Sequence, residues 1–276
     1  MISLVFPCVS KGESLLPSSN GYLLFSALSR ACSGTVLEDV FHGGDRDKPF
    51  SLSRMEPGQE AERNGGNFRV PAAASCSFRI SFARDDLGEF FAGLISGARL
   101  QIGRRAEFIA GKAFLPGEHP DSGCCSIESL LPAGVPPSVK LVFASPTGFK
   151  RGGKQFVFPL PELLFGSLLQ KWHTWTGQEP PGKPGTCFAG ITVNPYDLKT
   201  SAVLVRKGAV QRGCVGEAEY LLAQVDSETA WTAAFLANFA FFSGVGVKTS
   251  MGMGQVYCHK EKPHRKNNYL YREAFN

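Results

Sequence analysis

Long apolar runs are absent from this sequence of 276 residues, because no stretch approaches the roughly 18 consecutive apolar residues of a membrane-spanning helix. The start, Met1-Ile-Ser-Leu-Val-Phe-Pro7, has neither the basic segment nor the long apolar segment of a secretory signal peptide. Both absences argue against a membrane protein or an exported one. We therefore expect a cytoplasmic protein without a membrane partner.

Cysteine pairs at metal-ligand spacing are also missing. None of the eight cysteines stands in a Cys-x-x-Cys pair, and no ligand spacing fits a zinc site. In a reducing compartment, scattered cysteines are most simply small residues of the core. We expect no metal and no cofactor. The expected core cysteines are Cys8, Cys32, Cys76, Cys124, Cys125, Cys187, Cys214 and Cys258.

Acidic residues are lacking where basic residues gather. Residues 138–158 hold no Asp or Glu, and from Lys248 to the C-terminus there are six Lys or Arg against two Glu. The formal net charge is only +5, so the distribution says more than the total. Such clusters suit a phosphate backbone, although a solvated charged surface gives the same pattern. The basic residues of the acid-free stretch are Lys140, Lys150, Arg151 and Lys154.

The order of predicted elements repeats in two halves. Apolar periodicity predicts strands over residues 2–7, 49–55, 75–83 and 99–114, with helices over 20–32 and 87–95. The second half has predicted strands over 139–144, 191–210, 215–224 and 255–259, with a helix from Pro161 and another around residues 231–242. Strand, helix, two strands, helix, strand is the βαββαβ order of a ferredoxin-like (RRM-like) fold.

The predicted class is therefore α+β, with two tandem ferredoxin-like domains and a C-terminal Gly-rich loop. The turn-rich segment Leu131-Pro-Ala-Gly-Val-Pro-Pro-Ser138 separates them, so the domains are expected over residues 1–130 and 138–276. Two such domains suggest a cleft lined by sheets, a shape that nucleic-acid binders of this topology use.

The Gly-rich segment is Ser243-Gly-Val-Gly-Val-Lys-Thr-Ser-Met-Gly-Met-Gly254. Glycines let backbone N–H groups approach a phosphate closely, although the same residues also form plain turns. A P-loop needs Gly where Val247 stands, and a dinucleotide fingerprint needs Gly where Thr249 stands. We thus expect contacts with a phosphate backbone and consider a small-nucleotide enzyme poorly supported. The candidate RNA-binding residues here are Gly244, Gly246, Lys248, Thr249, Gly252 and Gly254.

A second segment, Phe41-His-Gly-Gly-Asp-Arg-Asp-Lys-Pro-Phe-Ser-Leu-Ser53, carries His42 in a predicted flexible, charged loop with Lys48 six residues on. Histidine moves protons near neutral pH, and a nearby lysine stabilises charge on a phosphorane. A loop histidine can equally be inert. Asp45 and Asp47 also leave a metal-binding interpretation open.

These segments occur together with Ser145-Pro-Thr-Gly-Phe-Lys150, with the block from Phe158 to Trp172 and with Gly213-Cys-Val-Gly216. The whole pattern resembles the CRISPR-associated repeat-processing endoribonucleases, the sixth Cas family within the RAMP superfamily. The resemblance spans most of the chain. The Gly-rich loop alone indicates the superfamily, and the other segments favour the processing nuclease.

The resemblance implies metal-independent cleavage of CRISPR repeat RNA in a precursor crRNA, leaving 5′-hydroxyl and 2′,3′-cyclic phosphate ends. The 2′-hydroxyl attacks its own phosphate, so a base, an acid and a cation suffice. By position, His42 matches the family's catalytic histidine and Lys48 its loop lysine. Some members add a tyrosine on the first helix, a region where this sequence has Ser26, Ala27 and Ser29.

Other RNA contacts are expected from basic residues, and partner proteins from the resemblance. Arg206 and Lys207, in a predicted hairpin, could enter an RNA stem or its flank, and Arg30 or Arg46 could add charge at the site. The partners expected are the repeat RNA and other Cas proteins of an effector complex. The alternative is a non-catalytic RAMP subunit that holds crRNA. The remaining candidate contacts are Lys150, Arg151 and Lys154.

Overall fold

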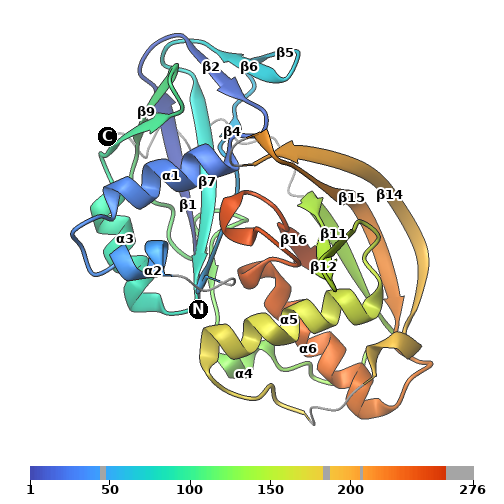
Figure 1. The fold of residues 1–276 in the computed structure, drawn as a ribbon. Coiled ribbons are helices and arrows are strands. Elements are labelled where there is room, and N and C mark those ends of the chain that lie inside the picture. Colours follow the sequence, from blue (N-terminus) through green and yellow to red (C-terminus); the bar gives the residue numbers. More distant parts are fainter. Residues whose placement is uncertain (44–47, 183–186, 206–207, 259–276) are drawn as a thin grey trace.

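The computed structural model describes residues 1–43, 48–182, 187–205 and 208–258, which form two sheets, each with its own hydrophobic core (Figure 1). Two helices cover one face of the N-terminal sheet, because alternate strand residues are apolar on that face. The elements of this half are β1 (Ile2–Ser10), α1 (Gly21–Ala31), β3 (Phe50–Leu52), β7 (Ser75–Phe82), α3 (Asp85–Ile95), β8 (Arg99–Ile102) and β9 (Ala106–Ala110).

The N-terminal sheet has the strand order β3-β7-β1-β9-β8 with antiparallel neighbours, the order of a ferredoxin-like fold. In the β1–β7 register, Phe6 lies opposite Phe78, and their rings stack at 5.0 Å inside the core. The next pair, Val5 and Arg79, must point to the other face. That open face looks toward the second sheet.

The C-terminal half repeats the arrangement. Its sheet has the order β14-β15-β11-β16, and α5 and α6 cover one face, at the lower right of Figure 1. Trp172 of α5 packs edge-on against Phe235 and Phe239 of α6, with ring centroids 4.8 and 5.3 Å apart. The elements are β11 (Ser138–Thr147), α5 (Pro161–Thr176), β14 (Thr192–Leu204), β15 (Val210–Leu221), α6 (Ser227–Ser243) and β16 (Val256–Cys258).

Helix termini of this half follow local chemistry. Pro161 opens α5 at a position where its missing N–H costs nothing, and Gly177 ends the helix with φ of 67°. The carboxylate of Asp226 caps α6 by accepting a hydrogen bond from the Thr229 N–H at 2.9 Å.

Several short elements were not predicted. They are too short to show apolar periodicity, and most lie at the surface. They are β2 (Ser14–Pro17), α2 (Glu38–His42), β4 (Glu56–Pro57), β5 (Glu62–Asn64), β6 (Asn67–Val70), β10 (Gly123–Cys124), α4 (Ile127–Leu130), β12 (Phe149–Arg151), β13 (Lys154–Phe156), and the 3-10 turns η1 (Phe188–Gly190) and η3 (Thr249–Met251).

The α+β class with two ferredoxin-like domains is confirmed, with two corrections. Residues 99–114 form the hairpin β8–β9 instead of one strand, because Gly103 turns the chain with φ of 68°. Cys124 and Cys187 are exposed, so their predicted core positions are wrong, whereas Cys8 and Cys214 are among the buried thiols. The domain boundary itself stays a prediction. In the described part of the chain, no helix is long and apolar enough to cross a membrane.

Candidate active site

His42 is the last residue of α2 and is exposed, whereas its neighbour Phe41 is buried. The Phe41 ring stacks on Phe50 at 4.5 Å and on Phe25 at 6.0 Å, which fixes α2 against α1 and β3. The predicted flexible loop is therefore wrong for His42, because the apolar anchor at Phe41 holds this end of the segment in a helix. Residues 44–47, with Asp45, Arg46 and Asp47, lie outside the described residues.

The imidazole of His42 has a partner on α1. Its Nε2 lies 3.0 Å from the Oγ of Ser29, which is 6% exposed. A hydroxyl both donates and accepts, so it can pair with either tautomer of the ring. Sequence reasoning placed Ser29 in the region of the family's tyrosine but gave it no role, because the contact joins residues 13 apart.

Lys48 comes close to the same segment from the other end. Its ammonium donates to the carbonyl of Gly43, the residue after His42. Its own carbonyl accepts a hydrogen bond from Trp175 Nε1 at 3.0 Å, so α5 of the second half fixes the backbone here. The structure thus brings the two predicted catalytic residues into one neighbourhood. Arg30 turns elsewhere, donating to Ser26 and to the carbonyl of Gln101.

The Gly-rich loop is packed against the protein itself. A Cβ on Gly246 would lie 2.2 Å from the Gly148 carbonyl oxygen, and one on Gly252 would lie 2.9 Å from the Cα of Gly21. Gly244 and Gly254 likewise approach backbone of the same loop, and all four have positive φ. The space beside these four glycines is therefore occupied by the protein's own backbone.

Two polar residues of the loop differ in exposure. Lys248 is exposed and has a φ of 61°, so its side chain projects at a tight bend. Thr249 is buried, and its Oγ1 accepts a hydrogen bond from Lys171 Nζ of α5 at 2.9 Å. Of the two, only Lys248 presents its side chain to a large ligand.

A basic hairpin borders the Gly-rich loop. Strands β12 and β13 carry Lys150, Arg151 and Lys154, all exposed. The hairpin begins next to Gly148, whose carbonyl accepts a hydrogen bond from the Val247 N–H at 2.9 Å. The exposed basic side chains of the hairpin and Lys248 therefore lie on neighbouring segments of the surface. Arg206 and Lys207 lie outside the described residues.

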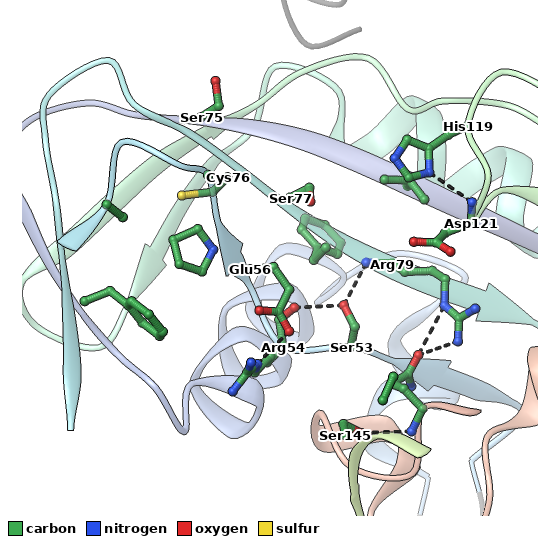
Figure 2. A pocket seen from close by; sticks show the side chains of 18 of the residues that line it. Ser53, Arg54, Glu56, Ser75, Cys76, Ser77, Arg79, His119, Asp121 and Ser145 are labelled. Carbon is green, nitrogen blue, oxygen red and sulfur yellow. Dashed lines mark hydrogen bonds and ion pairs between the residues drawn. The ribbon is translucent and has the colours of Figure 1, made fainter. Parts of the chain in front are cut away.

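A hollow of about 570 Å³ lies mainly over residues of the first half around β4 and β7, and Ala144, Ser145, Gln255 and Tyr257 of the second half line one part of it (Figure 2). Arg79 projects from β7 into this interface and is 5% exposed. Its Nε and Nη2 donate to the amide oxygen of Gln255 at 3.1 and 2.5 Å, and its guanidinium lies 4.4 Å from the ring centre of Phe241. Nη1 has no hydrogen-bond partner among the described residues. Sequence reasoning missed Arg79, which interrupts the serines of the open face.

Tyr257 also packs against this arginine, with its ring centre 5.2 Å from the guanidinium carbon and 5.9 Å from the ring centre of Phe241. Burial raises the pKa of its phenol to about 12, so the hydroxyl stays neutral at physiological pH. His119, at the rim of the hollow, has its pKa lowered by burial, and the nearby Asp121 charge opposes that effect. Among the described residues, no three His, Cys, Asp or Glu side chains gather as they would around a metal ion.

In comparison with known proteins, the second half of the chain matches a sequence family. Residues 141–256 match the sequence family described as CRISPR-associated endoribonuclease Cas6. A relative of that description from Mycobacterium tuberculosis (strain CDC 1551 / Oshkosh) is 33% identical over 129 residues, covering 46% of this chain and 40% of the relative. One from Streptococcus thermophilus is 30% identical over 125 residues, covering 44% of this chain and 51% of the relative. The matched part thus spans about half or less of the curated relatives' length.

Solved structures extend the likeness to nearly the whole chain. A Cas6 product complex has a TM-score of 0.71 at 25% identity and covers 94% of this chain and 100% of that one. A product complex of a Thermus thermophilus Cas6 has a TM-score of 0.74 at 25% identity, covering 94% and 99%.

Two ferredoxin-like domains in one chain, with a Gly-rich loop packed between them, are the architecture that this chain has in common with the solved Cas6 structures. The sequence match of the second half and the fold match of the whole agree. The chain is thus similar to Cas6 proteins in sequence over its second half and in fold over nearly its whole length, in agreement with the resemblance drawn from the sequence.

Proposed function

We propose that this chain is a metal-independent endoribonuclease that cuts CRISPR repeat RNA within precursor crRNA. The observation that carries the proposal is the pairing of an exposed histidine with a hydroxyl, His42 Nε2 to Ser29 Oγ at 3.0 Å, beside the backbone on which Lys48 is anchored. The pairing holds a proton-transfer group in a fixed orientation at the surface, where a phosphodiester can reach it.

In this reaction the nucleophile comes from the RNA. The 2′-oxygen attacks the adjacent phosphorus, and its proton passes to a base. The 5′-oxygen then leaves with a proton from an acid, so the products carry a 2′,3′-cyclic phosphate and a 5′-hydroxyl. His42 serves as the proton carrier. Because Ser29 can donate or accept, its hydroxyl keeps a hydrogen bond with the ring as the protonation changes.

Lys48 has the electrostatic role. The phosphorane gains negative charge as the 2′-oxygen attacks, and a nearby ammonium stabilises that charge. The contact of Lys48 with the Gly43 carbonyl keeps the ammonium beside the residue that follows His42. No metal ion is required for charge neutralisation in this scheme.

The repeat RNA follows the basic surface of the second half toward His42. Lys248 and the β12–β13 hairpin contribute exposed positive charge on neighbouring segments. Gly244, Gly246, Gly252 and Gly254 contribute indirectly, because their backbone approaches shape the loop from which Lys248 projects. The solved Cas6 structures that resemble this chain support an RNA substrate, since they include a product complex and a substrate mimic complex.

A second candidate function is that of a non-catalytic subunit that holds crRNA. It is favoured by one observation: α1 carries Ser26, Ala27 and Ser29 where some members of the family have a catalytic tyrosine. The Ser29–His42 hydrogen bond favours the nuclease, because a purely binding surface does not need an oriented imidazole.

The test is cleavage of repeat RNA with the metal ions chelated. We expect cutting to persist in EDTA and to yield 2′,3′-cyclic phosphate ends. A matched substrate with a 2′-deoxynucleotide before the cut should bind with unchanged affinity and stay intact, because it lacks the nucleophile. Cleavage that requires added magnesium, or cleavage of the 2′-deoxy substrate, contradicts the mechanism. Binding without any cleavage favours the subunit that holds crRNA.

A further inference from the structure

One face of α5 contacts both halves of the proposed site. Lys171 is 2% exposed, and its Nζ donates to Thr249 Oγ1 of the Gly-rich loop at 2.9 Å. Trp175 follows four residues later, on the same face of the helix, and its Nε1 donates to the Lys48 carbonyl at 3.0 Å. A single helix face therefore bonds to the loop of the second half and to the catalytic segment of the first.

Burial and packing restrict the side chains that make these two bonds. Trp175 is 7% exposed and packs edge-on against Phe239, with ring centroids 5.5 Å apart and planes at 89°. Its N–H can therefore point in few directions. Thr249, which receives the Lys171 ammonium, is 5% exposed. The side chains that make the two contacts are thus all buried.

The same stretch of the first half is held at two further points by the second. Ser51 Oγ donates to the Phe242 carbonyl at 2.6 Å in a buried position, and the Gly252 N–H donates to the Leu52 carbonyl at 3.1 Å. Together with the Trp175 bond, these contacts tie residues 48–52 to α5, to α6 and to the Gly-rich loop. Strand β3 pairs with β7 on its other edge, so it lies between the two halves.

We propose that Lys171 and Trp175 are positioning residues, which set the distance between the His42 segment and the Gly-rich loop. This inference rests on the proposed function. RNA held by the second half must present one phosphate to a histidine of the first half, and an error of about 1 Å in that alignment costs up to a hundredfold in rate. Lys171 and Trp175 fix the alignment through Thr249 and Lys48, without touching the substrate.

The chemistry of Lys171 supports a specific role. Burying an ammonium costs free energy that an apolar side chain of similar length would not cost. The rest of this helix face supplies apolar residues to the core, namely Leu164, Leu168 and Trp172. Among these apolar neighbours, the ammonium of Lys171 makes a buried hydrogen bond to the Gly-rich loop through Thr249.

The test compares Lys171→Met and Trp175→Phe with wild type in single-turnover cleavage of repeat RNA. Methionine keeps the length of the side chain, and phenylalanine keeps the ring packing while removing the N–H donor. We expect each to lower the rate about tenfold or more while the Kd for RNA stays unchanged, since alignment and not contact is lost. Lys171→Arg should recover most of the rate, because it restores a cationic donor. Gln170→Met, on the exposed side of α5, is the control and should cut normally.

A second readout does not depend on cleavage. Amide hydrogen exchange in residues 48–52 and 248–254 should become faster in Lys171→Met and Trp175→Phe and stay unchanged in Gln170→Met. Faster exchange with a wild-type cleavage rate overturns the positioning role, as does slower cleavage caused entirely by weaker binding. If the wild-type protein does not cut repeat RNA, the proposed function fails. Unchanged exchange in both Lys171→Met and Trp175→Phe would overturn the structural link between the His42 segment and the Gly-rich loop.

Discussion

Phe41 and His42 are adjacent in sequence but have opposite environments. The phenyl ring is buried against Phe25 and Phe50, which fixes the backbone at this point. The imidazole that follows is therefore exposed on an anchored backbone. Ser29 completes the arrangement from α1. At this scale, the site depends on one anchored neighbour and one hydrogen bond.

Ser29→Ala removes that hydrogen bond and little else. We expect the single-turnover rate to fall about three- to tenfold, because one hydrogen bond contributes roughly 1 kcal/mol to the ring's orientation. Affinity for repeat RNA should stay the same. Ser26→Ala is the matched control, since Ser26 lies on the same helix and accepts from Arg30 instead. A wild-type rate in Ser29→Ala, or an equal loss in Ser26→Ala, would show that the contact has no part in catalysis.

At the scale of elements, the Gly-rich loop is the least obvious feature. Its glycines allow the backbone of the loop to meet the backbone around Gly148 and Gly21. The loop therefore joins the two halves, and any effect of its glycines on RNA comes through the shape of the loop.

Gly246→Ala tests this interpretation of the loop. With φ of 75° and a backbone oxygen 2.2 Å from the new Cβ, we expect a loss of about 2 kcal/mol or more in the free energy of unfolding. Gly153→Ala has the same φ of 75° with nothing within 4 Å, so it should cost only about 1 kcal/mol. Chemical denaturation of both variants measures the difference. Equal losses in the free energy of unfolding would mean that the close approach to Gly148 adds nothing to the cost of Gly246→Ala.

The long elements were predictable from sequence, and the site was only partly so. Strands such as β1 and β7 alternate apolar residues that face one core, and α6 has aromatic residues at helical spacing. Helix α2 has five residues, too few for apolar periodicity, so the sequence predicts a loop at His42. The contacts of Ser29, Lys171 and Arg79 join segments that are distant in sequence, and no local pattern encodes them.

At the scale of the whole molecule, the charges that we propose for RNA binding lie on the second half and the proposed proton carrier, His42, lies on the first. Lys248 projects from the loop that joins them. Lys248→Ala should weaken binding of repeat RNA and lower the slope of log Kd against log salt by about one unit, the value for one phosphate contact. Lys11→Ala, at a surface ion pair with Glu107, is the control. An unchanged salt slope in Lys248→Ala would remove this residue from the RNA path.

Stability of the whole molecule should also depend on His119. Burial lowers its pKa, and its Nδ1 accepts a hydrogen bond from the Asp121 N–H at 3.0 Å, which the protonated ring cannot do. The unfolded chain therefore binds this proton more readily, and stability should fall as the pH drops below about 6.5, the ordinary histidine value. His119→Gln should show a smaller fall in thermal midpoint over that range. The same fall in both proteins would assign it to other groups.

The central claim, that His42 carries the proton in RNA cleavage, is tested most directly by His42→Ala on repeat RNA, with the single-turnover rate and the affinity measured together. We predict a rate lower by about 10²–10⁴, the usual cost of losing a general acid or base, with unchanged Kd. Lys48→Ala should slow cleavage less, because it stabilises charge without carrying a proton. A near wild-type rate in His42→Ala would put the active site elsewhere. A loss of binding by orders of magnitude would instead make His42 a recognition residue.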